Sequence, residues 1–385
     1  MGILSTLGFG ADHKVRYAMV GLGDITQEAM LPGVAHTGNS VVTALVTDDP
    51  EKARALGERY GVEHTYSYAQ FGAMLASGHV DAIYLGTPNW RHAEFVVPAL
   101  EAGIHVLVEK PLEVSTDKCL EIIAAEKMSK AKLMVAYRLH FEPATLDAIG
   151  RIRRDEIGDP VLFTATFSQM VDPANHRAHS GEDAGPVLDM GPYPINAARY
   201  LFGAEPTEVV SAVGVRHPAA GLGDFADTVA VTLRFPGDRL AQFVVSYAAN
   251  GIDSYSIVGT KGSITMSPAF MFGKPLEQQQ MVGEQKSSRS FKSTDHFGGE
   301  LKYFSQCILE GEDPEPDGEE GFADVRVIEG VMRAMKTGAA EKLEPFHRTK
   351  RIDVEGQLER LSSKRPPPLV NASNPAKGKD EAGMT

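Results

Sequence analysis

The feature of this sequence that most constrains the fold is a regular alternation of strand-like and helix-like segments over residues 15–138. The strand-like segments are apolar on both faces, and helical patterns of about ten to fifteen residues separate them. These segments are VRYAMVG, VVTALVT, DAIYLGT, HVLVEK and KLMVAYR. Buried strands joined by helices form βαβ units, so the sequence predicts a doubly wound parallel sheet of the α/β class.

The last helix of this series, over residues 116–130, shows how the sequence predicts the start of a helix and its buried face. Ser115 is a candidate N-cap for a helix over residues 116–130, and Asp117 suits the positive first turn. We expect a single apolar stripe to face the sheet. Its members are Leu120, Ile123, Ala124 and Met128.

After about residue 140 the pattern changes to longer alternating strands. Runs such as ADTVAVTLRF and RLAQFVVSYA, with PGD between them, predict a mostly antiparallel sheet. Helical patterns at residues 298–309 and 319–337 are expected to cover one of its faces. We therefore divide the chain into residues 14–138, 139–346 and 347–385. From about residue 362 the composition favours a mobile tail over an arm that wraps a partner.

The bulk composition argues against several classes of function. The 385 residues are too many for one ordinary core, and 38 basic against 51 acidic residues give a net charge of -13. Such a field repels phosphate backbones and anionic lipids, so we expect no nucleic acid and no membrane partner. The two cysteines are too few for a disulfide framework, and the opening MGILSTLGFG lacks the basic n-region and the cleavage site expected of a signal peptide. These features favour a cytoplasmic protein.

A candidate nucleotide site begins where the first strand turns into a helix, at Gly21-Leu22-Gly23-Asp24-Ile25-Thr26. Glycines at this point let backbone N–H groups and a helix N-terminus approach a pyrophosphate. The third glycine of the usual fingerprint is Thr26 here, and Gly-x-Gly also occurs in ordinary tight turns. The place of this turn, after a strand and before a βαβ series, favours a dinucleotide.

The end of the second strand decides between NAD and NADP. A carboxylate there accepts from the ribose 2′-hydroxyl and repels a 2′-phosphate. The position holds Thr47, with Lys52 in the next turn, and this pair slightly favours NADP. Asp48 and Asp49 favour NAD, although a helix cap before Pro50 explains them at least as well.

Two further strand ends are expected at the same edge of the sheet. Thr87 and Asn89 can donate to a cofactor or accept from it without charge, whereas His92 has either a cofactor-edge role or a structural one. The next strand ends in Glu109-Lys110-Pro111, where a nicotinamide ring would lie. The proline biases the lysine towards extended backbone, which aims its ammonium group.

Taken in order, these motifs resemble the Gfo/Idh/MocA family of NAD(P)-dependent oxidoreductases over about residues 15–345. The motifs that carry the resemblance are Gly21-x-Gly23, Thr87-Pro88-Asn89 with His92, Glu109-Lys110-Pro111 and Asp189-x-Gly191-x-Tyr193. Within the family the chain is most similar to the glucose-fructose oxidoreductase group and related sugar dehydrogenases. That closer similarity rests on Tyr137-Arg138-Leu139-His140 and on LDMGPYPINAARYLFG.

The resemblance implies a Rossmann domain followed by an α/β domain with a large open-faced sheet. It also implies that Lys110 is the catalytic lysine, with Asp189 and Tyr193 as partners from the second domain. Many relatives that oxidise cyclitols keep a histidine where this chain has Tyr193, so the tyrosine agrees with the sugar-oxidising branch. The chain departs from the family's glycine run before the aspartate, of which only Gly185 remains, and this departure affects the shape of the substrate loop.

The chemistry of sugar oxidation suggests a role for each of these residues. A carbinol needs a base for its hydroxyl proton while the hydride leaves for the nicotinamide. Phenols ordinarily keep their proton at neutral pH, and a nearby ammonium favours the phenolate. We therefore expect Tyr193 to act as acid and base with help from Lys110, while Asp189 orients the lysine or accepts from a sugar hydroxyl. Because Pro194 disfavours helical backbone before it, we expect the next helix to begin there.

Two further residues and one further segment are candidates for the site. Arg138 and His140 follow the last strand of the series, so both are expected to contact the substrate, and Arg138 also borders the cofactor. The segment Asn175-His176-Arg177-Ala178-His179 contains HxxH but has no third ligand at a suitable spacing. Surface polarity explains this segment better than zinc, and we expect no metal.

The sequence thus predicts a NAD(P)-dependent oxidoreductase that acts on the CH–OH groups of sugars or related polyols. Two alternatives stay open: a cyclitol or dihydrodiol dehydrogenase, and a nucleotide-binding sensor or scaffold without turnover. Retention of both Lys110 and Tyr193 favours catalysis. A broad sheet face that exposes apolar side chains to water favours association with another protein. We therefore also expect a homodimer or homotetramer formed through the second sheet.

Overall fold

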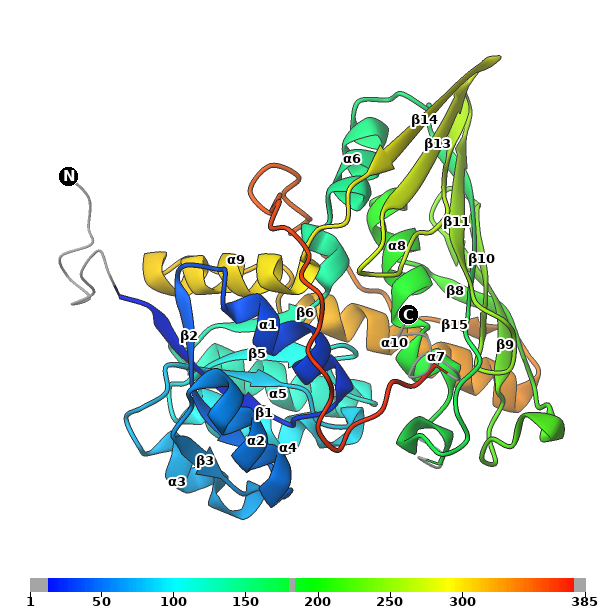
Figure 1. The fold of residues 1–385 in the computed structure, drawn as a ribbon. Coiled ribbons are helices and arrows are strands. Elements are labelled where there is room, and N and C mark those ends of the chain that lie inside the picture. The colour runs from blue at the N-terminus through cyan, green and yellow to red at the C-terminus, as the bar shows by residue number, and fades with distance from the viewer. Residues whose placement is uncertain (1–12, 180–183, 377–385) are drawn as a thin grey trace, which may run out of the picture.

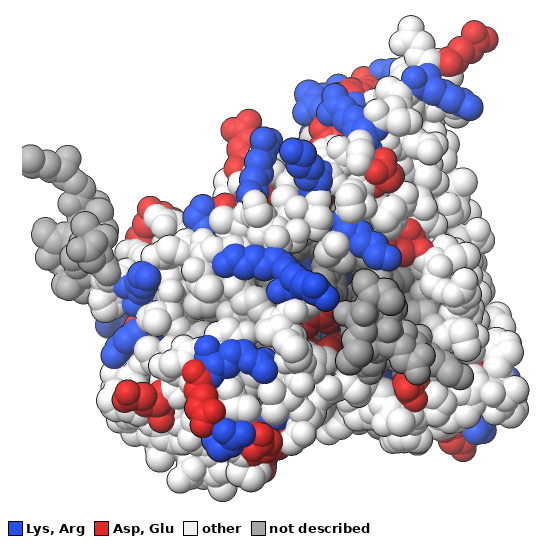
Figure 2. Space-filling model, in the orientation of Figure 1, with Lys and Arg blue, Asp and Glu red and all other residues white. Residues whose placement is uncertain are grey.

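A computed structural model describes residues 13–179 and 184–376. Two sheets, each with the helices that pack on it, form a first half and a second half that meet side by side (Figure 1). Charged side chains of both signs are interspersed over the face shown in Figure 2. Within the described residues, no helix combines the length and the apolar character needed to cross a membrane.

The first sheet is parallel throughout, and its strand order is β3-β2-β1-β4-β5-β6. Its strands are β1 (Val15–Val20), β2 (Ser40–Val46), β3 (His64–Tyr66), β4 (Ala82–Leu85), β5 (His105–Glu109) and β6 (Leu133–Ala136). The predicted doubly wound sheet is confirmed, and β3 is a strand that the apolar pattern did not show. The order reverses between β1 and β4, which is where open α/β sheets bind ligands.

Helices cover both faces of the first sheet. They are α1 (Leu31–Val34), α2 (Pro50–Tyr60), α3 (Phe71–Leu75), α4 (His92–Glu101) and α5 (Thr116–Met128). Ser115 caps α5 as predicted, since its side chain accepts from a backbone N–H of the first turn. The predicted stripe is wrong, because Leu120 is 52% exposed while Cys119 and Ile122 are fully buried. Cysteine packs as a small apolar side chain, and omitting it misplaced the buried face.

Helix α9 (His296–Glu310) packs on the first sheet, although the sequence pattern assigned it to the second. Its side chains Phe297, Leu301 and Phe304 share one apolar core with Tyr17 of β1. The hydroxyl groups of Tyr17 and Ser305 also form a hydrogen bond of 2.8 Å. The prediction followed chain order, whereas tertiary packing returns this segment to the first half.

The second sheet has nine strands in the order β14-β13-β12-β11-β7-β10-β9-β8-β15. They are β7 (Pro160–Ser168), β8 (Glu208–Val215), β9 (Thr228–Phe235), β10 (Arg239–Ser246), β11 (Ile252–Gly259), β12 (Gly262–Met266), β13 (Leu276–Val282), β14 (Gln285–Phe291) and β15 (Glu341–Lys342). The sheet is mostly antiparallel, as predicted, with β7 and β10 as its parallel pair.

One face of the second sheet is covered by helices, and the other is open. The covering helices are α6 (Pro143–Arg153), α7 (Pro186–Asp189), α8 (Pro192–Phe202) and α10 (Gly318–Thr337). No helix of the described residues lies on the opposite face (Figure 1). This arrangement confirms the open-faced sheet that the family resemblance implied.

Residues 362–376, for which the sequence favours a mobile tail, lie against both halves of the protein (Figure 1). Ser362 forms a bridge to Thr294, and Ala376 forms an antiparallel bridge to Val171. Between these points the chain passes the start of the first helical segment of the first half. We call residues 368–376 the C-terminal strap.

Candidate active site

A cavity of about 420 Å³ lies between the two halves at the carboxyl edge of the first sheet. Most of the predicted site residues line it, and these are Gly21, Gly23, Asp24, Ile25, Thr47, Lys52, Thr87, Asn89, Glu109, Lys110, Arg138, Asp189 and Tyr193. His92 and His140 were also predicted for the site but lie behind its walls. The position of the cavity is the one expected for a dinucleotide in an open α/β sheet.

The glycine turn presents bare backbone to this cavity. Gly21 has a φ of 85°, and a Cβ there would lie 2.7 Å from the carbonyl oxygen of Gly86. A Cβ on Gly23 would meet no atom within 4 Å, since this residue faces open space. Thr26, which replaces the third glycine, donates its hydroxyl to the Gly21 carbonyl at 2.7 Å. The unusual fingerprint therefore still forms a turn that a pyrophosphate can approach.

At the end of β2, both acidic side chains are engaged by the protein. Asp49 accepts from two backbone N–H groups of the first turn of α2, each at 3.0 Å, so the helix-cap explanation is confirmed. Asp48 accepts from the backbone N–H of Tyr68 at 2.8 Å. Thr47 and Lys52, by contrast, line the cavity. The cavity near the end of β2 is therefore bordered by Lys52 and by Thr47, whose hydroxyl accepts from the backbone N–H of Asp49 at 3.2 Å.

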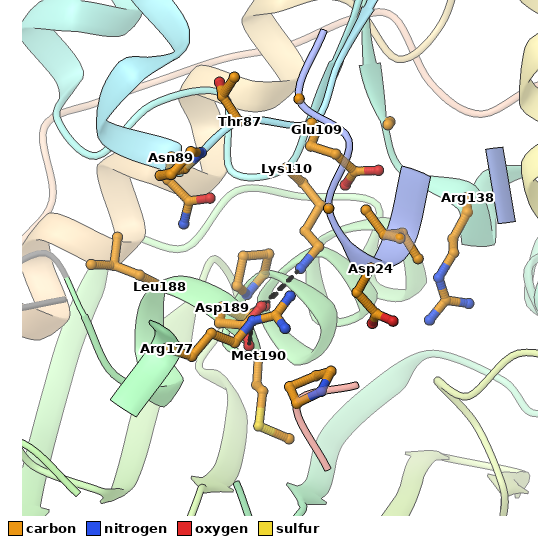
Figure 3. Close-up of a pocket in the computed structure, with 18 of the residues that line it drawn as sticks. Asp24, Thr87, Asn89, Glu109, Lys110, Arg138, Arg177, Leu188, Asp189 and Met190 are labelled. Atoms are coloured by element: carbon orange, nitrogen blue, oxygen red, sulfur yellow. Dashed lines mark hydrogen bonds and ion pairs between the residues drawn. The ribbon is translucent and has the colours of Figure 1, made fainter. Parts of the chain in front are cut away.

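The loop after β4 supplies uncharged groups to the wall, as predicted (Figure 3). The Oγ1 atom of Thr87 is buried and has no hydrogen-bond partner within the described protein. An unsatisfied buried hydroxyl costs about 1–3 kcal/mol, so this atom suits a ligand that can pair with it. The bare backbone of the glycine turn and the buried hydroxyl of Thr87 are both suited to contact with a bound dinucleotide.

His92 has a structural position instead of the predicted cofactor contact. Its side chain is fully buried, with Nε2 at 3.1 Å from the Thr87 carbonyl oxygen. Its Nδ1 lies 3.1 Å from the carbonyl oxygens of Pro111 and Leu112. Burial lowers the pKa of His92 to about 4. The imidazole thus lies between the loop after β4 and the chain that follows Lys110, and its neutral form donates to only one of the two.

The end of β5 brings a cation to the centre of the cavity. The ammonium group of Lys110 donates to the backbone carbonyl of Asp189 at 2.8 Å and lies 3.6 Å from its carboxylate (Figure 3). The same nitrogen lies 4.7 Å from the ring centre of Tyr193. Glu109 accepts from the hydroxyl of Tyr84 at 2.9 Å, and burial raises the pKa of its carboxyl group. A lysine of the first half and a tyrosine of the second therefore share one cavity.

Asp189 is the centre of a charged cluster at the end of α7. Its carboxylate accepts from the hydroxyl of Tyr247 at 2.7 Å and lies 3.3 Å from the guanidinium group of Arg177. Burial by itself would raise the pKa of Asp189, but Arg177 and Lys110 outweigh it, and the pKa falls to about 2. The carboxylate is therefore ionised at neutral pH and holds two cations at the cavity.

The hydroxyl of Tyr193 contacts Arg138 rather than Lys110. Arg138 is 6% exposed and donates to the phenol oxygen at 3.1 Å. Its other nitrogen lies 3.2 Å from Nδ1 of His296. Helix α8 begins at Pro192, two residues before the predicted start, because proline is compatible with the first turn of a helix. The phenol thus projects from that first turn, with a guanidinium group at its oxygen and an ammonium group over its ring.

His140 does not reach the cavity, so the predicted substrate contact is not formed. It is 1% exposed, and its Nε2 forms a hydrogen bond of 2.8 Å with the side-chain oxygen of Asn196. The amide of Asn196 donates in turn to Glu320, which pairs with Arg199. Burial lowers the pKa of His140 to about 4. This residue belongs to a buried polar network behind the active site.

Sequence reasoning missed two residues of the cluster around Asp189. Arg177 belongs to the segment for which the sequence favours a polar surface loop, yet it lines the cavity. Its Nη1 atom is buried and has no hydrogen-bond partner in the part of the chain that the structure describes. Tyr247 follows β10 and gave no signal beyond its place after a strand. Within residues 13–179 and 184–376, no group of three or more His, Cys, Asp or Glu is arranged to hold a metal ion.

Comparison with known proteins agrees with this geometry. A model of the oxidoreductase family with an NAD-binding Rossmann fold matches residues 15–137. A model of the GFO/IDH/MocA C-terminal domain matches residues 146–265. The chain belongs to the Gfo/Idh/MocA oxidoreductase family. It is therefore an oxidoreductase that binds NAD or NADP.

Several members of this family are similar to the chain over most of its length. The D-xylose 1-dehydrogenase [NADP(+)] of Haloarcula marismortui is 32% identical, covering 86% of this chain and 94% of the relative. The aldose-aldose oxidoreductase from Caulobacter crescentus, solved with glycerol, is 33% identical with a TM-score of 0.81 and covers 86% of this chain and 100% of its own. A 3-ketoreductase from Actinomadura kijaniata, solved with NADP and TDP-benzene, is 25% identical with a TM-score of 0.76, and the match covers 84% of this chain and 98% of that one.

Proposed function

We propose that this oxidoreductase transfers a hydride between a sugar, either an aldose or a related polyol, and NADP. The observation that carries the proposal is the meeting of Lys110, Asp189 and Tyr193 in one cavity that also contains the glycine turn. Relatives named as a xylose dehydrogenase and an aldose-aldose oxidoreductase support the sugar class. Thr47 and Lys52 at the ribose end support NADP over NAD.

In this proposal Tyr193 is the acid and base. When the dinucleotide is bound, its nicotinamide supplies the hydride acceptor or donor. The phenol oxygen takes the hydroxyl proton of the substrate during oxidation and returns it during reduction. Arg138 donates to that oxygen at 3.1 Å and stabilises negative charge as it develops there. The buried guanidinium group thereby shares the role that the sequence gave to Lys110 alone.

Lys110, Asp189 and Arg177 hold the substrate in this proposal. The ammonium group of Lys110 is fixed by two oxygens of Asp189, so it points at a defined place beside the phenol. The buried Nη1 atom of Arg177 has no acceptor among the described residues, which suits a substrate oxygen. A polyhydroxylated substrate offers both donors and acceptors to this cluster, whereas an apolar substrate would leave the charges unpaired.

The test is a steady-state screen of aldoses, polyols, cyclitols and dihydrodiols with both nicotinamide coenzymes. We expect turnover with aldoses, and a loss of at least about 100-fold in kcat in Tyr193→Phe, the usual size of a general acid–base contribution. Fluorescence titration of the variant should show unchanged NADPH affinity. Equal kcat in the variant and the parent would reject Tyr193 as the acid and base, and turnover confined to cyclitols or dihydrodiols would reassign the substrate.

We also propose that the open face of the second sheet pairs with a second copy of the chain. Exposed apolar side chains lie on this face in β7, β8 and β11, and the strand register puts them on one side. They are Leu162, Val213, Val215, Ile252 and Val258, with exposures of 38% to 60%. These side chains have no covering helix among the described residues, and a second copy of the chain would remove them from water.

A further inference from the structure

The C-terminal strap lies beside the cavity and contacts both halves. It lies outside both regions that the family models match, residues 15–137 and 146–265. We propose that residues 368–376 form the outer wall of the dinucleotide site and control the release of the bound nicotinamide dinucleotide. The proposal rests on dinucleotide binding alone, so it does not depend on which sugar is the substrate.

The first anchor of the strap is next to the glycine turn. The backbone N–H of Val370 donates to the side-chain oxygen of Gln27 at 2.8 Å, and the Gln27 amide donates back to the Val370 carbonyl at 3.0 Å. The same amide nitrogen also donates to the carbonyl of Leu22 at 2.9 Å. Leu22 lies between the two glycines of the turn, so one buried side chain joins the strap to the place where a pyrophosphate binds.

The second anchor is helix α2, beside the ribose end of the site. The Asn371 amide donates to the carboxylate of Asp49 at 3.1 Å, and Asp49 is the residue that caps α2. Near the other end of that helix, Arg59 donates to the carbonyl of Pro368 at 2.8 Å. The strap therefore spans the helix that carries Lys52 and is fixed near both of its ends.

The third anchor lies in the second half of the protein. The Pro375 carbonyl accepts from the backbone N–H of Asp172 at 2.9 Å, and Ala376 continues this pairing in a bridge to Val171. Pro375 is buried, and both Asn374 and Pro375 line the cavity. The segment that receives the strap leads directly to Arg177, so the strap also supports the loop that brings this cation to the site.

The composition of the segment suits a fixed wall. Pro366 and Pro367 precede the strap and Pro368 begins it, and proline restricts the backbone before folding, so less conformational entropy is lost when the segment docks. Prolines also lack the N–H group that would otherwise need a partner at the surface. A dinucleotide held between the glycine turn and the second half is therefore bordered by a strap that must detach before the two halves can separate.

The test measures dinucleotide release without any sugar present. The full-length protein is loaded with NADPH, mixed with excess NADP in a stopped-flow instrument, and followed by NADPH fluorescence. Val370→Pro removes the N–H donor to Gln27, and Val370→Ala is the matched control that keeps it. We expect release from Val370→Pro to be about tenfold faster than from Val370→Ala, the change that corresponds to losing one hydrogen bond of about 1.4 kcal/mol.

A second pair of variants covers the case in which Val370→Pro fails to fold. The double variant Arg59→Ala/Asn371→Ala removes two exposed strap contacts, while Arg54→Ala removes an exposed arginine of the same helix that pairs only within α2. We expect faster release from the double variant, a parental rate from Arg54→Ala, and faster hydrogen exchange in residues 368–376 of the double variant. Parental release in folded strap variants would overturn the strap proposal, whereas a protein that binds neither NADPH nor NADH would instead overturn the oxidoreductase function.

Discussion

At the scale of single residues, the ribose end of the site gives the sharpest expectation. Lys52 faces the cavity while Asp48 and Asp49 are held by backbone N–H groups elsewhere. Removing the ammonium group should therefore weaken binding of the coenzyme that carries a 2′-phosphate. For Lys52→Ala we expect the Kd of NADP to rise by about tenfold and the Kd of NAD to change by less than about twofold. Fluorescence titration checks this, with Lys52→Arg as the control that keeps the charge; an equal loss for both coenzymes would contradict it.

The buried side chain of His140 predicts how the unfolding free energy depends on pH. Its pKa is about 4 in the folded protein, below the value of roughly 6.5 for a free imidazole, because burial disfavours the charged form. The unfolded chain therefore binds the proton first, so the stabilising contribution is complete above pH 6.5 and is lost as the pH falls towards 4. Between pH 7 and pH 5 this loss amounts to about 2 kcal/mol of unfolding free energy.

The matched variant is His140→Gln, whose side chain does not titrate and can still bond to Asn196. Urea unfolding at pH 7 and pH 5 should show a decline in unfolding free energy that is about 2 kcal/mol smaller in the variant than in the parent. The other buried histidines, including His92, contribute equally to both proteins and cancel in this comparison. Parallel pH dependence in the two proteins would show that folding does not lower the pKa of His140.

Within the first half, most of the predicted residues that line the cavity lie at a strand end or in the turn directly after one. Lys110 follows β5 directly, and its side chain can reach only the carboxyl edge of the sheet. His92 and His140 lie a few residues beyond a strand end, where the chain has turned and a side chain can point inward or outward. Arg177 lies in the short 3-10 helix His176–Ala178, and its position depends on contact with Asp189 rather than on a strand end.

At the scale of elements, α9 shows that a local sequence pattern can predict a helix without predicting which sheet it packs on. Hydrophobic periodicity located this helix within about two residues, but it could not tell which sheet the helix covers. The answer depends on Phe304, which is fully buried against residues of β1 and α1. Pairings between segments nearly 300 residues apart leave no local pattern in the sequence.

We expect Phe304→Ala to lower the unfolding free energy by about 3–5 kcal/mol, as truncation of a buried phenylalanine usually does. The exposed neighbour Gln306→Ala should change it by less than about 0.5 kcal/mol. Hydrogen exchange then tests the location, since protection should fall in β1 and β2 and persist in β9 and β10. A loss of protection confined to the second sheet would contradict the packing described for α9.

At the scale of the whole molecule, the sequence predicts the class of each sheet but not how the two halves pack together. Continuous apolar strands separated by helices can satisfy their backbone groups only in a covered parallel sheet, so residues 15–138 determine the first half. Alternating strands joined by short turns determine the second in the same way. The course of residues 362–376 depends on a few hydrogen bonds to Gln27, Asp49 and Asp172, and a composition rich in proline and lysine does not predict them.

The open face of the second sheet carries the last expectation. Val213 is 60% exposed and Ile252 is 54% exposed, and both side chains point away from the covering helices. If a second copy covers this face, a lysine at either position must bury an ammonium group without a partner, which costs several kcal/mol. We expect sedimentation velocity to show a dimer or tetramer for the parent and mainly monomer for Val213→Lys/Ile252→Lys. Met128→Lys, on the exposed side of α5, should leave the assembly unchanged, and a monomeric parent would show that this face is exposed in solution.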